Sequence, residues 1–498
     1  METATFLLIS LVLLGIYVYF RRRLNYFKSL GVPYVPSGLF GSLSGVIFGT
    51  KYKSYLLREL YNYQPEAKYI GVYNFTQPII LLRDLDLIKN LAVKHFENFP
   101  SHVPFVDDMV DPMFGVNLFN MAGDRWKETR NLLTPTFTGN KMKGSFELMV
   151  KCGENLVNYL EELPDEEREK IPTKNFFGRL ATDLIATCAF GLQVDSLKNP
   201  KNEFFRFGMN ALSSFTPTKQ ACARTFPRLM KLLNIKIFND QTRDYFSNIV
   251  KDTVANRDEQ GVTRADMIQL LMNARSKEWK HIDVTLDFMA GQAITFFFGG
   301  FDTTSMQMCI LAHELALNPE VQRRLQEEID EVMEKTNGSP TYEAINGMAY
   351  LDAVFDESLR CRSQVSSIDR VCSKEFELPP ALPGAKPFTL KPGMVVWIPV
   401  QPIHEDPKYF TNPEKFDPDR FYEKRVNGDV PSNFGFGIGP RICIGRRFAK
   451  LEIKVLFFYI LSKFEFVPNA DTNLPVQFDK SQFNQDYSLS VKWRKKNQ

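Results

Sequence analysis

An almost unbroken apolar run opens the chain, and basic residues follow it at once. Positions 4–20 are nearly all apolar or small, and Arg21-Arg22-Arg23 come next. Seventeen residues at about 1.5 Å each reach the short end of the length that a membrane-spanning helix needs. A cleaved secretory signal would carry its basic residues before the run and a small-residue cleavage site after it. We therefore expect a retained transmembrane anchor over residues 3–20, with a lumenal N-terminus because arginines stay on the cytoplasmic side.

Helical periodicity dominates the pattern beyond a short linker. Residues 21–38 are basic and then proline-rich, which predicts a stiff connection between anchor and body. Residues 68–82 read as a small β-hairpin. Apolar positions at helical spacing then recur, for example in residues 180–188 and 321–332. We find no second linker and no internal repeat, so residues 39–498 are expected to form one mainly α-helical domain with minor, small antiparallel sheets.

The stretch 285–317 predicts the longest helix of the body. It contains no proline and would extend about 50 Å. It is apolar nearly all round, as a helix through the centre of a protein should be, while its charged residues argue against a second membrane span. Gly299 and Gly300 at its midpoint each cost about 1 kcal/mol relative to alanine, so something there should need space or a local distortion. Asp302 and Thr303 beside them are suited to proton delivery, although such a pair can also simply cap a kink.

A glycine-rich stretch near the end of the chain, residues 433–447, surrounds one cysteine. Four glycines and a proline lie between residues 435 and 445, so the backbone must turn tightly or let something bulky approach. After Gly445 the pattern becomes helical, which places Cys443 on a loop at a helix N-terminus. Free N–H groups and nearby cations lower the pKa of a thiol. The loop predicts an activated thiolate ligand; a turn around an inert cysteine is the plainer alternative.

Composition excludes several classes of protein. The 61 basic and 58 acidic residues leave a net charge of +3, which argues against general nucleic-acid binding. Seven scattered cysteines do not suggest a disulfide framework, so the body is expected in a reducing compartment. No CxxC or HExxH pattern occurs, and a zinc site is therefore not expected.

Five short motifs, in order along the chain, resemble those of the cytochrome P450 family. The glycine-rich stretch is similar to the haem-binding signature of that family, with Phe436, Gly439, Arg441, Cys443 and Gly445 at the matching positions. The other four motifs are Trp126-x-x-x-Arg130, Gly300-Phe301-Asp302-Thr303, Glu357-x-x-Arg360 and Pro418-Asp419-Arg420-Phe421. The resemblance covers the chain from Pro33 onward. Residues 131–138 and 305–314 look like the microsomal clan, and the insect detoxification enzymes of that clan are the closer match.

The resemblance implies haem b as the cofactor and gives each motif a role. Cys443 would be the axial thiolate, a ligand that favours O–O cleavage. Phe436 would belong to the haem-binding loop, and the propionate donors would be Trp126, Arg130, Arg370 and Arg441. Asp302 and Thr303 would deliver protons for oxygen activation. A buried cluster would support the cysteine loop without a chemical role, formed by Glu357, Arg360 and Arg420.

The implied activity is insertion of one oxygen atom from O2 into lipophilic small molecules, with electrons from NADPH. The chain shows no flavin- or nicotinamide-binding motif, so a separate NADPH–cytochrome P450 reductase is implied, with cytochrome b5 as a second candidate partner. Basic residues on the cysteine side could receive the reductase: Lys127, Arg130, Arg446, Arg447, Lys450 and Lys454. With the anchor, these features predict a single-pass protein of the endoplasmic reticulum membrane with a cytosolic catalytic domain.

Two other functions remain open. One is an isomerase or dehydratase of the same fold that acts on peroxides without O2, and the other is a non-catalytic haem-binding protein. The Asp302–Thr303 pair favours the monooxygenase, because an enzyme that does not use O2 has no need to protonate it.

The resemblance also suggests where substrate would bind. Residues 103–119, 204–238 and 365–368, with Phe298 and Phe301, match the pocket walls of the family and are mostly apolar. Part of this set, residues 226–238, could also dip into the membrane surface. One stretch departs from the family: an aromatic residue and one or two prolines usually follow the Glu-x-x-Arg motif, whereas this chain has Cys361-Arg362-Ser363-Gln364-Val365. We expect the backbone to run differently there, and the sequence does not identify the substrate.

Overall fold

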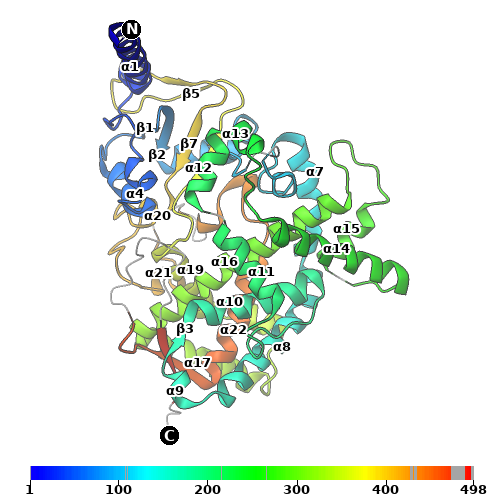
Figure 1. The fold of residues 1–498 in the computed structure, drawn as a ribbon. Coiled ribbons are helices and arrows are strands. Elements are labelled where there is room, and N and C mark those ends of the chain that lie inside the picture. The colour runs from blue at the N-terminus through cyan, green and yellow to red at the C-terminus, as the bar shows by residue number, and fades with distance from the viewer. Residues whose placement is uncertain are drawn as a thin grey trace. The chain divides into compact units, whose positions relative to one another are not determined.

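Helices make up most of the chain in a computed structural model, which describes residues 2–106, 108, 110–214, 216–264, 266–426, 430, 434–472 and 488–494. The chain divides into two compact units, each built from separate stretches of sequence (Figure 1). Unit 1 comprises residues 1–103, 365–411 and 437–442. Unit 2 comprises residues 104–364, 412–436 and 443–498.

Unit 1 contains a four-stranded sheet in the order β1-β2-β7-β4. The strands β1 (Tyr69–Asn74) and β2 (Gln77–Leu82) form the antiparallel hairpin that the sequence predicts. In contrast, β7 (Val395–Ile398) pairs with β2 in parallel and with β4 (Ile368–Val371) in antiparallel fashion. The expectation of purely antiparallel sheets is therefore wrong for this sheet. The β2–β7 pair joins segments far apart in the chain, and local periodicity carries no signal for such a pair.

The remaining elements of unit 1 are short, apart from α1 and α4. A second hairpin is formed by β5 (Phe376–Leu378) and β6 (Phe388–Leu390). The helices and helical turns are α2 (Tyr26–Ser29), α3 (Ser44–Ile47), α4 (Lys53–Asn62), α5 (Leu85–Lys89), η1 (Asn90–Lys94), η2 (Phe96–Asn98), α20 (Val400–His404) and η6 (Gly439–Arg441). The core of this unit joins α4 to the sheet through buried aliphatic side chains such as Leu57, Ile70 and Leu81.

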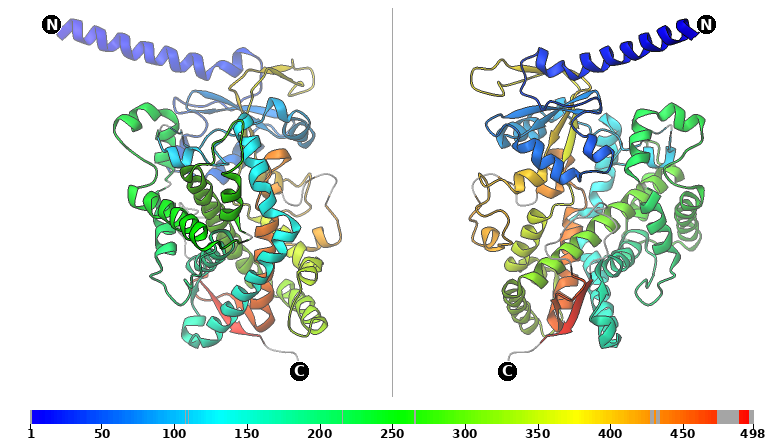
Figure 2. Two further views of the ribbon diagram at one scale, coloured as in Figure 1. Left: turned by 90° about the vertical axis from the view of Figure 1, so that its right-hand side faces the viewer. Right: turned by 60° about the vertical axis from the view of Figure 1, so that its left-hand side comes forward.

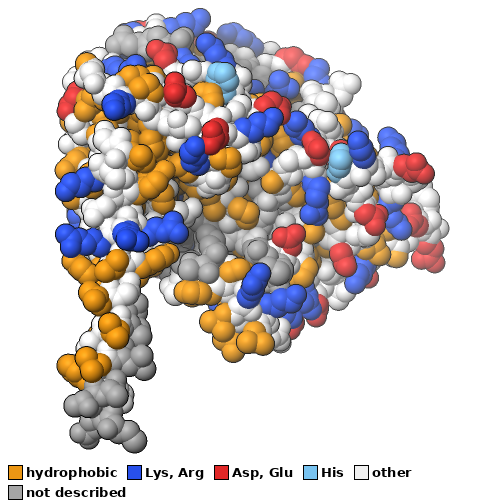
Figure 3. Space-filling view, turned by 90° about the horizontal axis from the view of Figure 1, so that it is seen from above, with side chains coloured by type: hydrophobic (Ala, Val, Ile, Leu, Met, Phe, Trp, Pro, Cys, Tyr) orange, Lys and Arg blue, Asp and Glu red, His pale blue; other side chains and the backbone are white. Residues whose placement is uncertain are grey.

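The N-terminal helix α1 (Glu2–Leu24) projects beyond the sheet of unit 1 (Figure 2). Apolar side chains such as Phe6 and Leu11 are exposed along it, and three arginines occupy its last turn. Figure 3 shows hydrophobic side chains along this helix and Lys and Arg side chains gathered at its base. A search of the described residues finds no helix that is long and apolar enough to cross a membrane.

Unit 2 is organised around the long helix α16 (Leu286–Leu317), which occupies almost the whole stretch expected from the sequence. The Thr285 side chain caps its start by accepting a hydrogen bond from the N–H of Phe288 at 3.1 Å. The helix packs against α10 (Thr173–Ile185), α14 (Asp240–Gln260) and α19 (Ala349–Cys361). Because neighbours cover most of its faces, most of its residues are buried, which explains its nearly uniform apolar character.

A second helix pair in unit 2 carries the segment after the cysteine loop. Here α22 (Arg446–Lys463) packs along α8 (Gly139–Glu162). A three-stranded sheet follows in the order β3-β9-β8, formed by β3 (Ile171–Pro172), β8 (Phe464–Val467) and β9 (Ser488–Trp493). The other helical elements are α6 (Pro112–Gly115), α7 (Gly123–Leu133), η3 (Thr134–Phe137), α9 (Asp165–Arg168), η4 (Ala186–Phe190), α11 (Glu203–Ser214), α12 (Pro217–Thr225), α13 (Pro227–Leu232), α15 (Met267–Ala274), α17 (Pro319–Lys335), α18 (Tyr342–Gly347), α21 (Asp419–Tyr422) and η5 (Phe434–Phe436).

Candidate active site

Cys443 lies immediately before α22, as the sequence predicts. Its backbone N–H donates to the carbonyl of Phe436 at 2.8 Å, which closes the loop back on η5. Burial raises the pKa of the Cys443 thiol, while the backbone N–H of Gly445, the positive charges of Arg130 and Arg446, and the N–H of Arg446 act in the opposite direction. The side chain is nevertheless exposed, so the sulfur is accessible to a ligand. Such a sulfur can coordinate a metal, and coordination removes the thiol proton outright.

The glycines of the loop allow close packing. Gly439 has a φ of +74°, a conformation that favours glycine, and a Cβ at this position would overlap the carbonyl of Ala92 within unit 1. At Gly435, a Cβ would lie 3.0 Å from the Leu359 side chain of α19. Two of the glycines that the sequence singles out therefore let backbone approach neighbouring elements.

The structure brings Glu357, Arg360 and Arg420 together in a fully buried cluster. Arg360 donates to both carboxylate oxygens of Glu357, at 2.8 and 2.9 Å, and Arg420 Nε donates to Oε1 at 3.0 Å. The backbone N–H of Asp417 adds a further bond to the same oxygen at 2.8 Å. The same helix, α19, also carries Phe355, whose ring stacks on Phe436 with centroids 6.3 Å apart. The cluster thus fixes the helix on which the start of the cysteine loop rests.

Asp302 and Thr303 lie at the midpoint of α16, where the buried surface of the helix is interrupted. The Thr303 side chain is exposed, and its Oγ1 donates to the carbonyl of Gly299 at 2.5 Å. Asp302 is half-buried, and burial raises the pKa of its carboxyl group to about 6, although the charge of Lys174 opposes this shift. Every residue of this segment belongs to the α-helix α16.

The two glycines beside this pair have different surroundings. A Cβ at Gly300 would overlap the side chain of Ile185 on α10, so this glycine is needed for helix packing. A Cβ at Gly299 would meet nothing within 4 Å. Gly299, exposed like Thr303, therefore faces open space rather than a packed neighbour.

The four expected propionate donors are divided between the units. Trp126 and Arg130 lie four residues apart on α7 in unit 2, a spacing that places both on one face of the helix. Trp126 is buried, and burial lowers the pKa of the Arg130 guanidinium. In unit 1, Arg441 on η6 donates from Nε to the carbonyl of Pro100 at 2.8 Å.

Arg370 on β4, also in unit 1, has an unusual environment. It is 1% exposed, and burial lowers the pKa of its guanidinium to about 10. Its Nη1 donates to the carbonyl of Asp369 at 2.7 Å, and its Nη2 donates to that of Ile438 at 3.1 Å. Among the described atoms its Nε has no hydrogen-bond partner. A buried arginine with an unused donor suits an anionic ligand such as a propionate.

His102 is a residue of this site that sequence reasoning missed. Its Nδ1 lies 3.2 Å from Asp369 Oδ1, and Arg370 Nη1 lies 3.3 Å from the same ring nitrogen. Burial lowers the pKa of His102, the hydrogen bond to Asp369 opposes this shift, and the charges of Arg370 and Arg441 add to the lowering. No motif includes His102; it is one of only five histidines in the chain, which is the one signal that could have directed attention to it.

These residues fit a haem group. The exposed sulfur of Cys443 can be an axial ligand, the unused Nε of Arg370 can take a propionate, and open space beside Gly299 leaves α16 free to border a bulky group. Each observation concerns a single unit. Taken singly, Cys443 has the chemistry of a haem-iron ligand, and Arg370 has that of a propionate partner.

The two aromatic residues of α16 that are expected to line a pocket, Phe298 and Phe301, differ in burial, and their place in a pocket wall stays a prediction. Phe298 is half-buried, stacks on Phe238 with centroids 5.3 Å apart, and contacts Phe114. Phe301 is instead buried among Phe297 and Phe205 in the packing of α10, α11 and α16. The two residues lie three apart and so on one side of the helix, but Phe301 lies where α16 meets α11.

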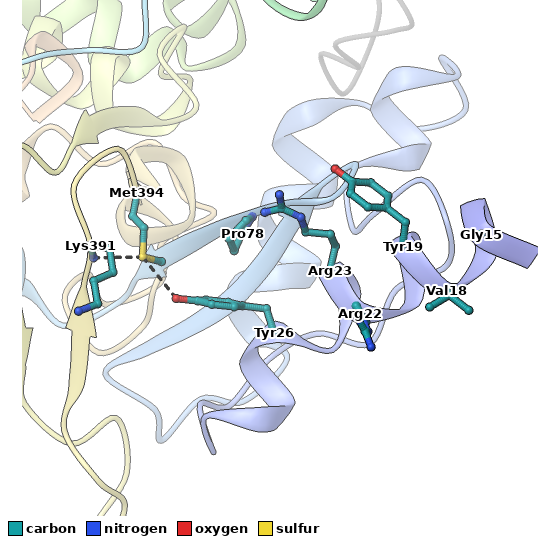
Figure 4. A pocket seen from close by; sticks show the side chains of 9 residues that line it. All are labelled: Gly15, Val18, Tyr19, Arg22, Arg23, Tyr26, Pro78, Lys391 and Met394. Atoms are coloured by element: carbon teal, nitrogen blue, oxygen red, sulfur yellow. Dashed lines mark hydrogen bonds between the residues drawn. The ribbon is translucent and has the colours of Figure 1, made fainter.

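A cavity of ≈ 560 Å³ opens elsewhere in unit 1, where the end of α1 meets the sheet. Its lining includes Arg22, Arg23 and Lys391 together with tyrosine and apolar side chains, and none of the expected site residues belongs to it. Figure 4 shows the side chains of Arg22 and Arg23 pointing in different directions. The backbone N–H of Lys391 and the hydroxyl of Tyr26 both donate hydrogen bonds to Met394 Sδ, at 3.3 and 3.8 Å. We therefore do not assign the candidate chemistry to this cavity.

Comparison with known proteins matches residues 36–491 to the family described as Cytochrome P450. The chain is 40% identical over 463 residues to "Cytochrome P450 9e2" of Blattella germanica, covering 86% of this chain and 85% of the relative. It is 36% identical over 485 residues to "Probable cytochrome P450 9f2" of Drosophila melanogaster, with 92% of each chain covered. It is also 36% identical over 474 residues to "Cytochrome P450 6j1" of Blattella germanica, covering 94% of this chain and 93% of the relative.

Proposed function

The chain belongs to the cytochrome P450 family of haem monooxygenases, and from this premise we propose that it oxidises lipophilic small molecules, xenobiotics among them. Membership implies a haem cofactor, O2 and electrons from NADPH that reach the enzyme through a redox partner. The nature of the substrate and the identity of the partner are the parts that we propose.

The residues that would hold haem b are those described above. Cys443 would supply the axial thiolate, and Trp126, Arg130, Arg370 and Arg441 would neutralise the propionates. When bound, haem supplies the means to activate O2 for insertion of one oxygen atom into a C–H bond or an equivalent group. Burial raises the pKa of the Cys443 thiol. The backbone N–H groups of Gly445 and Arg446 and the charges of Arg130 and Arg446 oppose this shift by stabilising the thiolate.

Proton delivery is the proposed task of Asp302 and Thr303. The Thr303 hydroxyl is exposed and donates its one hydrogen to the Gly299 carbonyl, which leaves its lone pairs free to accept a hydrogen bond. Rotation about the Cβ–Oγ1 bond would turn the same hydrogen toward a group outside the helix. The carboxyl of Asp302, with its pKa raised to about 6 by burial, can gain and lose a proton near neutral pH. The half-buried Asp302 beside the exposed Thr303, on a helix that is mostly buried, is the observation that carries the proposal. It favours a monooxygenase over a peroxide isomerase, because only the former must protonate O2.

A lipophilic substrate is supported by the side chains of unit 2. Phe114, Phe238 and the half-buried Phe298 form an aromatic cluster against one side of α16. Apolar and aromatic walls with few polar groups bind substrates chiefly by removing apolar surface from water. The names of the relatives mention no substrate, so the choice of xenobiotics rests on the resemblance to insect detoxification enzymes.

We further propose NADPH–cytochrome P450 reductase as the electron donor, with cytochrome b5 as an additional partner. Of the basic residues expected to form the docking patch, Lys454 is 1% exposed and pairs with Asp352 at 2.6 Å. Lys450 pairs with Asp356 at 3.3 Å. These two lysines are used within unit 2, so docking would depend on the others, of which Arg447 is exposed.

Membrane attachment and residence in the endoplasmic reticulum remain proposals supported by the sequence. The apolar run 4–20 and the arginines at 21–23 carry this part. A second support is the exposed apolar side chains of α13 and the residues after it, Leu229, Leu232, Leu233 and Ile235, which would suit contact with a membrane surface.

Reductase dependence tests the proposed function. Full-length haem-loaded protein in vesicles should convert an alkoxycoumarin probe when NADPH, reductase and O2 are all present, and should stop when any one is withheld. Turnover of an organic hydroperoxide without NADPH, together with no product from the complete system, would favour the isomerase or dehydratase. Haem binding without turnover in either assay would favour the non-catalytic protein.

A further inference from the structure

The first four residues of the proline-free stretch 361–365 each make a side-chain contact. Where the family usually has stiff prolines, this chain has Cys361-Arg362-Ser363-Gln364. The contacts are a bond from the Cys361 thiol to Glu357 (3.5 Å), an ion pair of Arg362 with Glu314 (3.4 Å), packing of Ser363 beside Gly435, and a hydrogen bond from Gln364 to the carbonyl of Thr303 (2.7 Å). Side-chain bonds thus restrain a backbone that proline would otherwise restrain through its fixed φ.

Gln364 reaches the proton-delivery segment directly. Its Nε2 donates to the backbone carbonyl of Thr303 at 2.7 Å and to Oε1 of Gln307 at 3.3 Å. A carbonyl oxygen can only accept, so the amide nitrogen must face Thr303, and the two hydrogens on this nitrogen serve both bonds. Gln307 in turn donates to Ser358 Oγ at 2.8 Å, and Ser358 Oγ donates to the carbonyl of Phe355 at 2.7 Å. A continuous chain of hydrogen bonds therefore links the Thr303 carbonyl to α19.

Thr303 is consequently held at two points. Its hydroxyl is bonded to Gly299 on its own helix, and its carbonyl is bonded to Gln364, which lies outside that helix. The neighbouring glycines lower the intrinsic stability of this helical turn, so a tether from another element has more influence here than elsewhere in α16. The only other acceptor bond expected at this carbonyl is the ordinary one from the residue 307 N–H.

We propose that Gln364 is a positioning residue for proton delivery, which fixes the turn of α16 that carries Asp302 and Thr303 against α19. This inference rests on the proposed function of that pair. The helix α19 also supports the start of the cysteine loop, because Phe355 stacks on Phe436. Through Gln364, α19 holds both the proton-delivery turn and the loop that leads to the thiolate. These side-chain contacts replace the rigidity that proline gives other members of the family.

Amide hydrogen exchange tests the tether without any turnover. In full-length haem-loaded protein, Gln364→Leu keeps the approximate size but removes the donor, and Gln364→Glu replaces the donor by an acceptor that repels the carbonyl. Both should speed exchange of the amides at 303–308 by roughly 3- to 10-fold, as loss of one neutral hydrogen bond does. The matched control Arg362→Gln removes the Glu314 ion pair from the same stretch and should leave these amides unchanged. Unchanged exchange in both Gln364 variants would overturn the proposal.

The fate of NADPH electrons tests whether the tether serves proton delivery. With reductase and the alkoxycoumarin probe, Gln364→Leu should raise the fraction of electrons released as hydrogen peroxide, in the direction of Thr303→Ala. The double variant should release no more than Thr303→Ala alone, because Gln364 acts through Thr303. Additive effects, or faster exchange with unchanged peroxide release, would contradict a positioning role. Failure of Thr303→Ala itself to release peroxide would count against the proposed function. Hydrogen exchange alone would then show whether Gln364 restrains the turn at Thr303.

Discussion

Among single residues, Thr303 has an exposed side chain in the middle of a mostly buried helix. Its hydroxyl donates to the Gly299 carbonyl, and its own carbonyl accepts from the Gln364 side chain. Thr303→Ala removes the hydroxyl and little else, so haem binding should persist while product formed per NADPH falls about tenfold or more. Thr303→Ser is the matched control, because it restores the hydroxyl without the methyl group. The carbon monoxide spectrum checks haem, and peroxide release checks coupling. Full coupling in the alanine variant would remove Thr303 from the account.

Asp302 predicts a pH dependence of stability with a defined sign. Its pKa is raised to about 6 by burial, whereas the unfolded chain has the ordinary value near 3.8. Between these values the folded state binds more protons than the unfolded state, so the free energy of unfolding falls as pH rises. Asp302→Asn cannot ionise, and its stability relative to the parent should therefore increase from about pH 4 to about pH 6. Thermal unfolding of both proteins across this window measures the difference, and a constant difference would contradict the raised pKa.

Residue-level prediction from the sequence depended on motifs. Cys443, Glu357, Arg360 and Arg420 belong to patterns that could be recognised, and the structure places the last three in one buried cluster. His102 and Gln364 belong to no pattern. Each gains its importance from a partner distant in the chain, and nothing local to either residue encodes that contact.

At the scale of elements, the adjacent glycines Gly299 and Gly300 in the middle of α16 provide a matched pair. Both substitutions with alanine gain the same helix propensity of about 1 kcal/mol. A Cβ at Gly300 must displace Ile185, whereas one at Gly299 enters open space. Gly300→Ala should therefore be less stable than Gly299→Ala by about 1–3 kcal/mol, and Ile185→Val should recover part of the loss. Urea unfolding of the haem-loaded variants measures this; equal stabilities would show that α10 does not constrain the helix at Gly300.

The cluster on α19 gives a second prediction at this scale. Arg420→Met leaves the buried Glu357 carboxylate with one arginine fewer, and removing one partner of a buried ion pair costs about 3–5 kcal/mol. The control Arg425→Met removes an exposed ion pair to Asp417 from the same segment and should cost less than about 1 kcal/mol. Urea midpoints and haem retention report both effects. Similar losses of stability in the two variants would mean that the buried ion pair contributes no more to stability than the exposed one.

Elements were predicted well where periodicity is local. The hairpin of β1 and β2 and the bounds of α16 follow from short-range pattern and turn residues. The parallel pairing of β2 with β7 and the division of the glycine-rich stretch between two units do not, because both depend on contacts between distant segments. The burial of Phe301 likewise depended on which helix lies against that face of α16.

At the scale of the whole molecule, residues implied in holding haem come from both units. Arg370 and Arg441 belong to unit 1, and Trp126, Arg130 and Cys443 belong to unit 2. The family resemblance supplied this set from the sequence, whereas composition and spacing alone indicated only a thiolate on a glycine-rich loop. Ligation of the haem iron by the Cys443 thiolate is the assignment on which the proposed function depends.

The carbon monoxide difference spectrum of the reduced, full-length, haem-loaded protein tests that claim most directly. The protein should show the red-shifted band of a thiolate-ligated haem. Cys443→His should shift the band to the position typical of histidine ligation, while Cys222→Ser, which alters another exposed cysteine, should leave it unchanged. A histidine-type band in the parent protein, or a thiolate band that survives Cys443→His, would contradict the assignment of Cys443 and the mechanism built on it.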